Sequence, residues 1–130
     1  MATWKELLKY VRHEYQVIRE DEDEIRILFE FEDERSQVMV IQREVLDEKY
    51  EWVQIASPCG VVANLDLKAV LEEIGNTTIC CGAAIMGEHL VVRHSLPLEN
   101  LDLNEFEDPL VLLAGTADRL EEMFTGGDEY

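Results

Sequence analysis

Apolar residues recur at helical spacing close to the start of the chain. Thr3 and Glu6 stand three residues apart at its beginning, and in such a capping box each side chain accepts a hydrogen bond from a free backbone N–H near the other. The apolar stripe that follows consists of Trp4, Leu7, Leu8, Val11 and Tyr15. This pattern predicts a first helix that ends near Tyr15.

Two later stretches show the same spacing. The second follows a capping residue, Asn64 or Asp66, and ends at Gly75, because glycine suits the left-handed position after a helix. Its stripe consists of Leu67, Val70, Leu71 and Ile74. The third begins at Asp108-Pro109, because proline is tolerated at the first helical position. Its stripe consists of Leu110, Leu113, Ala114, Ala117, Leu120 and Phe124.

Between these helices, residues 25–31 alternate between apolar and polar side chains, which is typical of a strand with one buried face. The apolar positions are Ile25, Ile27, Phe29 and Phe31. Residues 37–42 and 50–56 indicate two more strands with apolar side chains on both faces. We interpret the acidic run at residues 20–24 as a solvated connection and residues 57–60 (SPCG) as the break after the third strand.

The clearest hairpin joins residues 78–86 to residues 89–96, because Gly87-Glu88 suits a two-residue turn with glycine first. Its expected cross-strand pairs are Met86 with His89, Ala83 with Val92, and Cys81 with His94. The face assigned to the core carries Ile79, Cys81, Ala83, Ile85, Leu90, Val92, His94 and Leu96. The reverse face carries Cys80, Gly82, Ala84, Met86 and Val91.

The chain therefore predicts the element order α-β-β-β-α-β-β-α. Because the connections between neighbouring strands are short, we expect an α+β domain with a mainly antiparallel, five-stranded sheet and three helices. The length of 130 residues fits one domain, residues 1–130. Residues 126–130 are expected to form a frayed acidic tail.

Several segments carry a resemblance that covers nearly the whole chain. They are Trp52-Val53-Gln54-Ile55-Ala56-Ser57-Pro58, Leu65-Asp66-Leu67 with Val70-Leu71, Leu96-Pro97-Leu98, and Ala117-Asp118-Arg119-Leu120. With the element order, they resemble the type III secretion chaperone-like fold and are most similar to its YbjN-like branch. The resemblance implies a small acidic domain, usually dimeric, that binds an extended segment of a client protein or acts in stress regulation. It implies no catalytic residues.

Charge narrows the classes of partner. Asp and Glu number 29 against 11 Lys and Arg, which gives a net charge of −18. Such a field repels phosphate, so we expect no nucleic acid and no anionic membrane surface as a ligand. The three cysteines form no paired motif, and the chain shows no secretory signal or membrane span, which indicates reduced thiols in the cytoplasm.

Candidate chemistry is sparse. Cys81 and His94 could form a nucleophile and base, although a thiolate needs positive surroundings that this charge denies. Zinc could use Cys59 or Cys80 as further ligands, but no paired-ligand spacing supports it. The acidic run at residues 20–24 lacks the glycine of a calcium loop. We expect no bound metal, no cofactor and no enzymatic activity.

The reverse face of the hairpin is the informative feature, because it is apolar where a solvated face would be polar. Trp52, Ala84, Met86 and Val91 are the candidate partner-binding residues. In one interpretation the second helix covers this face; in the other, a second subunit or a client protein does. We therefore expect a protein-binding chaperone, adaptor or regulator that forms a homodimer. The alternatives are an acidic decoy that mimics nucleic acid, and an enzyme that uses Cys81 and His94.

Overall fold

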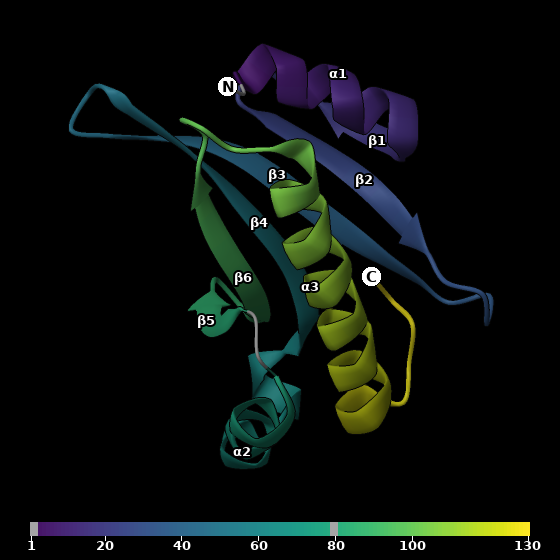
Figure 1. The fold of residues 1–130 in the computed structure, drawn as a ribbon. Coiled ribbons are helices and arrows are strands. Elements are labelled where there is room, and N and C mark those ends of the chain that lie inside the picture. The colour runs from purple at the N-terminus through teal and green to yellow at the C-terminus, as the bar shows by residue number, and fades with distance from the viewer. Residues whose placement is uncertain (1–2, 79–80) are drawn as a thin grey trace.

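The structure is a computed structural model that describes residues 3–78 and 81–130. It is a single α+β domain in which three helices accompany one open antiparallel sheet (Figure 1). The strands lie in the order β1-β2-β3-β4-β6-β5. The helices are α1 (Trp4–Glu14), α2 (Leu67–Thr77) and α3 (Leu103–Thr125), and a short 3-10 turn, η1 (Val62–Asn64), precedes α2. The strands are β1 (Gln16–Glu20), β2 (Glu24–Glu30), β3 (Ser36–Leu46), β4 (Tyr50–Val61), β5 (Gly82–Met86) and β6 (His89–Pro97).

The sheet has six strands, so the predicted five-stranded sheet is wrong by one strand. The missed strand is β1, and the element order is α-β-β-β-β-α-β-β-α. Apolar alternation could not reveal β1, because it is an edge strand in which Ile18 is exposed and Val17 is only half-buried. The connection within the acidic run is also shorter than predicted, because Glu20 is the last residue of β1 and Glu24 is the first residue of β2.

The predicted break at residues 57–60 is likewise wrong, because β4 continues to Val61. The strand passes this point through an irregularity between Pro58 and Gly60, where the register with β6 shifts. Such a bulge accommodates an extra residue, here the buried Cys59, without ending the pairing. Gly60 fits because a Cβ atom there would lie only 3.2 Å from the side chains of Leu65 and Thr125.

The three helices are found where they are predicted, but some of them begin or end at other residues. The predicted first helix is confirmed, with Thr3 accepting the Glu6 N–H. Of the two candidate caps for α2, Asp66 accepts the Ala69 N–H, but the predicted end at Gly75 is wrong because α2 runs on to Thr77. The predicted start of α3 at Asp108-Pro109 is wrong too. Asp102 begins the helix in a capping box, and Pro109 lies inside it.

The core lies between one face of the sheet and the helices, and α3 runs across the front of that face (Figure 1). The predicted core positions Ile25 and Ile27 of β2 are fully buried, as are Val53 and Ile55 of β4. The helices supply Leu7, Val11, Val70, Phe106, Leu110, Leu113 and Leu120. We call the opposite side of the sheet, which faces away from α3, the open face. Within the described residues, no helix is both long and apolar enough to cross a bilayer.

The predicted hairpin register is confirmed over the described part of β5, where Met86 pairs with His89 and Ala83 with Val92. The ladder ends at the pair of Gly82 and Arg93, one step before the expected pair of Cys81 and His94. Cys81 has a φ of +101°, which takes the chain out of the extended conformation. The predicted core residue Ile79 and the predicted reverse-face residue Cys80 lie outside the described residues.

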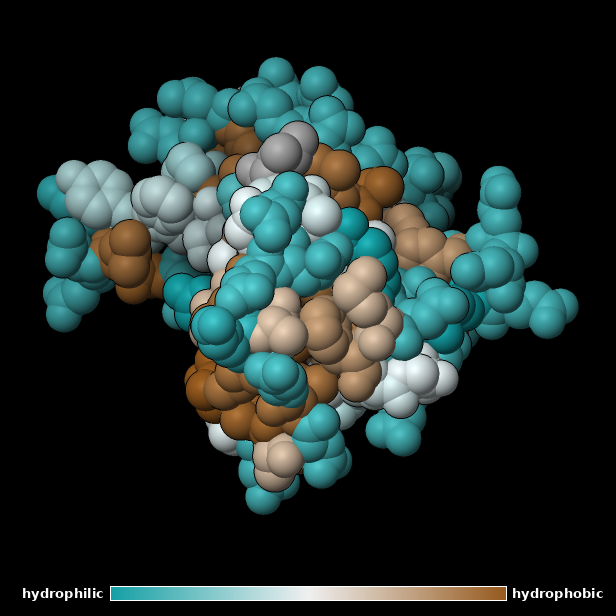
Figure 2. Space-filling model, turned by 90° about the horizontal axis from the view of Figure 1, so that it is seen from below, coloured by the Kyte–Doolittle hydropathy of each residue, from teal (hydrophilic) through white to brown (hydrophobic). Residues whose placement is uncertain are grey.

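The α2 stripe is only partly buried. Val70 is buried, whereas Leu71, predicted to face the core, is 53% exposed. Seen from the end of the molecule that carries α2, hydrophobic surface lies in patches between hydrophilic residues (Figure 2). Val70 is therefore the one residue of this predicted stripe that is fully enclosed.

Burial of Cys59 gives a chemical prediction. Its side chain is almost fully enclosed, and burial raises the pKa of the thiol to about 12. Because the thiolate is the reactive form, we expect Cys59 to resist iodoacetamide at pH 8 in the folded protein and to react readily in urea. Peptide mass mapping after timed labelling measures this, with the half-buried Cys81 as an internal reference. Labelling of Cys59 at the same rate with and without urea would contradict the burial.

Candidate functional site

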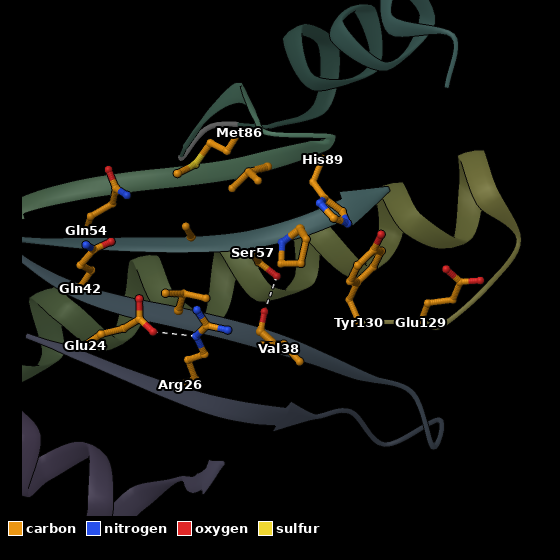
Figure 3. Close-up of a pocket in the computed structure, with 14 residues that line it drawn as sticks. Glu24, Arg26, Val38, Gln42, Gln54, Ser57, Met86, His89, Glu129 and Tyr130 are labelled. Carbon is orange, nitrogen blue, oxygen red and sulfur yellow. Dashed lines mark hydrogen bonds and ion pairs between the residues drawn. The ribbon is translucent and has the colours of Figure 1, made fainter. Parts of the chain in front are cut away.

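The open face carries a hollow of about 410 Å³ (Figure 3). Its lining comes from β2, β3, β4, the β5–β6 hairpin and the last residues of the chain. The lining residues are Glu24, Arg26, Val38, Val40, Gln42, Gln54, Ala56, Ser57, Pro58, Met86, His89, Val91, Glu129 and Tyr130. None of them belongs to a helix, so the hollow is formed by the sheet and the C-terminal segment.

Strand register explains why the floor of the hollow is apolar. Val40 pairs with Ala56 across β3 and β4, and Pro58 pairs with Val91 across β4 and β6. Ala84 of β5 continues this second row, because it pairs with Val91. Side chains of paired residues lie on the same face of a sheet, so these small and branched groups form a continuous surface. The floor suits contact with apolar side chains of another molecule.

Polar side chains border this floor on one side. Gln42 and Gln54 pair with each other on neighbouring strands, and both line the hollow. Beside them the Arg26 guanidinium donates to Glu24 at 2.7 Å, so these two charges are already matched (Figure 3). The two amides offer donors and acceptors of the kind that an extended backbone needs. This border can therefore recognise a peptide without contributing net charge.

A buried polar bridge holds the strands together where the β4 ladder is irregular. The Gln37 amide nitrogen donates to Ser57 Oγ at 2.9 Å and to the Pro58 carbonyl at 2.6 Å. Ser57 Oγ in turn donates to the Val38 carbonyl at 2.7 Å, the contact that is drawn as a dashed line in Figure 3. These bonds join β3 to β4 beyond Val40 and Ala56, the last pair of their ladder. They fix Ser57 and Pro58, which line the hollow.

The C-terminal segment closes one end of the hollow. The expectation that residues 126–130 form a frayed tail stays a prediction. In the structure the Tyr130 ring meets the His89 imidazole edge to face, with centroids 5.6 Å apart (Figure 3). Glu129 lies beside Tyr130 in the lining. This end of the hollow is thus aromatic and is formed by residues far apart in the sequence.

Arg35, which directly precedes β3, anchors this segment. Its guanidinium donates to the buried Asp118 at 3.0 Å and to the Gly127 carbonyl at 2.7 Å. Glu121 is fully buried and accepts the Glu129 N–H at 2.6 Å, while its other oxygen has no hydrogen-bond partner among the described residues. Burial raises the pKa of both Asp118 and Glu121, and Arg35 opposes the rise.

The carboxylates of Asp118, Glu121 and Asp128 lie within 4.8 Å of one another, the spacing of a cation site. Arg35 lies beside them, 3.0 Å from Asp118 and 3.8 Å from Asp128, and supplies positive charge. Among the described residues this is the cluster with metal-ligand spacing, and it includes neither a cysteine nor the acidic run at residues 20–24. The expectation of no bound metal stays a prediction.

The structure brings three of the four candidate partner-binding residues together. Met86 and Val91 line the hollow, and Ala84 pairs with Val91. By alternation along β4, Trp52 lies on the same face of the sheet as these residues. It lines a different hollow, however, near the hairpin between β3 and β4. No described residue of α2 lines the hollow, so the interpretation in which the second helix covers this face does not hold for it.

Sequence reasoning missed the polar half of the site. Gln42 and Gln54 stand at strand positions that alternation places on the open face, so the pattern could have indicated them. Tyr130 belongs to the segment predicted as a tail, and His89 is predicted only as the cross-strand partner of Met86. Their contact joins distant parts of the chain, and no local pattern signals it.

Comparison with known proteins finds no family model that matches the chain and no curated protein with a significant match to it. The resemblance to YbjN-like proteins therefore stays a prediction, and the function has to be inferred from the open face itself.

Proposed function

We propose that the protein is a non-enzymatic protein-binding domain, a chaperone, adaptor or regulator, that holds an extended segment of a partner protein on its open face. The observation that carries this proposal is the apolar floor of the hollow, which no described helix covers. The type III secretion chaperone-like resemblance points to the same class of function. The many acidic residues around the domain favour a basic partner segment.

Apolar contact supplies most of the affinity in this proposal. A fully buried apolar side chain contributes roughly 1.5–3 kcal/mol, whereas an exposed ion pair contributes about 0–1 kcal/mol and weakens with salt. Acidic side chains such as Glu20 and Asp23 already pair with Arg12 and Arg43. A decoy that mimics nucleic acid needs its carboxylates arrayed on one face and unpaired, so the apolar floor supports protein binding better.

Substitutions on β5 test the role of the open face. Met86 and Ile85 are neighbours on opposite faces of the strand, and they are 44% and 58% exposed, so the prediction that Ile85 belongs to the core is wrong. We expect Met86→Asp to lower recovery of bound partners about tenfold or more, because it places a charge on the apolar surface, and Ile85→Asp to have little effect. The measurement is affinity purification of both variants and the unaltered protein from the native host, with quantitative mass spectrometry.

We also propose a homodimer, in line with the type III secretion chaperone-like resemblance, that leaves the hollow free for the partner segment. Light scattering on the eluted peak should give twice the chain mass of 15.0 kDa for the unaltered protein and for both variants. Equal recovery of partners by both variants would contradict a binding role for the open face, and the chain mass for the unaltered protein would contradict the dimer. If the unaltered protein recovers partners at low salt but loses them at high salt, the result would favour the acidic decoy that mimics nucleic acid.

A further inference from the structure

Two residues that line the hollow come from outside the sheet. Glu129 and Tyr130 follow α3, and the Tyr130 ring lies against His89 of β6. Tyr130 is half-buried, and burial raises the pKa of its phenol above the ordinary value. In the close-up the ring stands at the end of the hollow, next to His89 and on the side of Ser57 (Figure 3). The chain thus places one of its own aromatic side chains in its candidate binding site.

The segment is attached mainly by hydrogen bonds. Glu129 N–H donates to Glu121, Arg35 donates to the Gly127 carbonyl, and Ser36 N–H donates to Asp128 Oδ2 at 3.2 Å. Gly126, Asp128 and Glu129 themselves are exposed. Because each of these bonds has a charged partner, they hold the backbone of Gly127 to Glu129 in place, while the Tyr130 ring itself is held by its contact with His89. Release of the ring alone therefore costs far less than unfolding the domain.

We propose that Tyr130 is an internal stand-in for an aromatic side chain of the partner, and that it leaves His89 when the partner segment binds. This inference rests on the proposed function and names the partner's chemistry. The partner presents an extended segment with one aromatic residue and basic residues on either side of it. The aromatic ring packs against His89 and the Met86 thioether, and the basic residues meet Glu129 and the acidic surface of the domain.

Competition between Tyr130 and the partner sets the expected effect. While the Tyr130 ring packs against His89, the aromatic side chain of the partner cannot do so, and only molecules in which Tyr130 has moved away bind the partner fully. Removing the Tyr130 ring frees this position in every molecule. An aromatic contact of ordinary strength then predicts binding that is about threefold to tenfold tighter.

A short peptide tests this without knowledge of the natural partner. The probe is a dye-labelled peptide with one tyrosine between two lysines on each side, and fluorescence anisotropy measures its affinity at about 0.15 M salt, which limits long-range attraction. A second peptide carries leucine in place of tyrosine and has the same charge. The proteins are the unaltered full chain, Tyr130→Ala, and a control, Tyr50→Ala, which removes an exposed tyrosine from outside the hollow.

We expect the tyrosine peptide to bind Tyr130→Ala about threefold to tenfold more tightly than it binds the other two proteins, and the leucine peptide to show little of this gain. Weaker or unchanged binding by Tyr130→Ala would overturn the inference and make Tyr130 a fixed wall of the site. The inference is also overturned if the tyrosine peptide binds none of the three proteins. The Met86→Asp and Ile85→Asp comparison decides the proposed function separately, since it does not involve Tyr130.

Discussion

Arg35→Met should lower the midpoint of thermal unfolding by roughly 10 °C or more. The Arg35 side chain is only 16% exposed and lies within 4 Å of carboxylates of Asp118, Glu121, Glu122 and Asp128. Methionine retains much of the aliphatic stem but removes the charge, so buried carboxylates are left without their cation. Breaking a buried ion pair from one side is costly because the remaining charge stays out of water. Circular dichroism during heating measures the shift.

Two further variants make the Arg35 result specific. Arg19→Met removes an arginine whose pair with Asp21 is more than half exposed, and it should change the midpoint by less than about 2 °C. Combining Arg35→Met with Asp118→Asn removes one of the stranded charges and should recover part of the loss. If Arg35→Met and Arg19→Met were equally mild, the cluster would not hold the end of α3 against the sheet.

Gln37→Met should lower the free energy of unfolding by about 1–3 kcal/mol, although methionine is close to glutamine in size and shape. Gln37 is fully buried, and its amide donates to Ser57 Oγ and to the Pro58 carbonyl. The substitution leaves that carbonyl without its donor at the irregular point of β4. The side-chain oxygen of Gln37, Oε1, has no hydrogen-bond partner within residues 3–78 and 81–130, so its removal offsets part of the loss.

Urea unfolding compares this variant with Gln42→Met, which lies on the open face of the same strand. Gln42 is half-buried and lines the hollow, so its replacement should change the free energy of unfolding by no more than about 0.5 kcal/mol. Equal stability of the two variants would mean that the bulge at Cys59 does not depend on the bridge from Gln37 to β4.

Local signals predicted much of this fold. The turn at Gly87, which has a φ of +64°, fixes the register of β5 and β6, and the side-chain cap at Thr3 marks the start of α1. Both signals act over a few residues, so a single sequence shows them. They were sufficient to place Ala84, Met86 and Val91 on one face of the sheet.

Features that depend on distant contacts could not be predicted in this way. β1 pairs with β2 through its backbone while its side chains stay largely exposed, so its sequence shows no apolar alternation. The capping box of Asp102 and Glu105 was overlooked because Pro109 gave a stronger local signal further along α3. The Arg35 cluster and the contact of Tyr130 with His89 form only once α3 lies on the sheet.

The strand order also bears on the rates of folding and unfolding. β1 to β4 are neighbours in both sequence and space, so this part of the sheet forms through hairpins, whose contacts are close in sequence and quick to make. Arg35 instead bonds to groups 83 and 92 residues further along, on α3 and just beyond it. We expect contacts that close such long loops to form late, after the barrier to folding has been crossed. The Arg35 cluster therefore acts mainly by slowing unfolding, and its strength sets how long a folded molecule survives more than how quickly one is made.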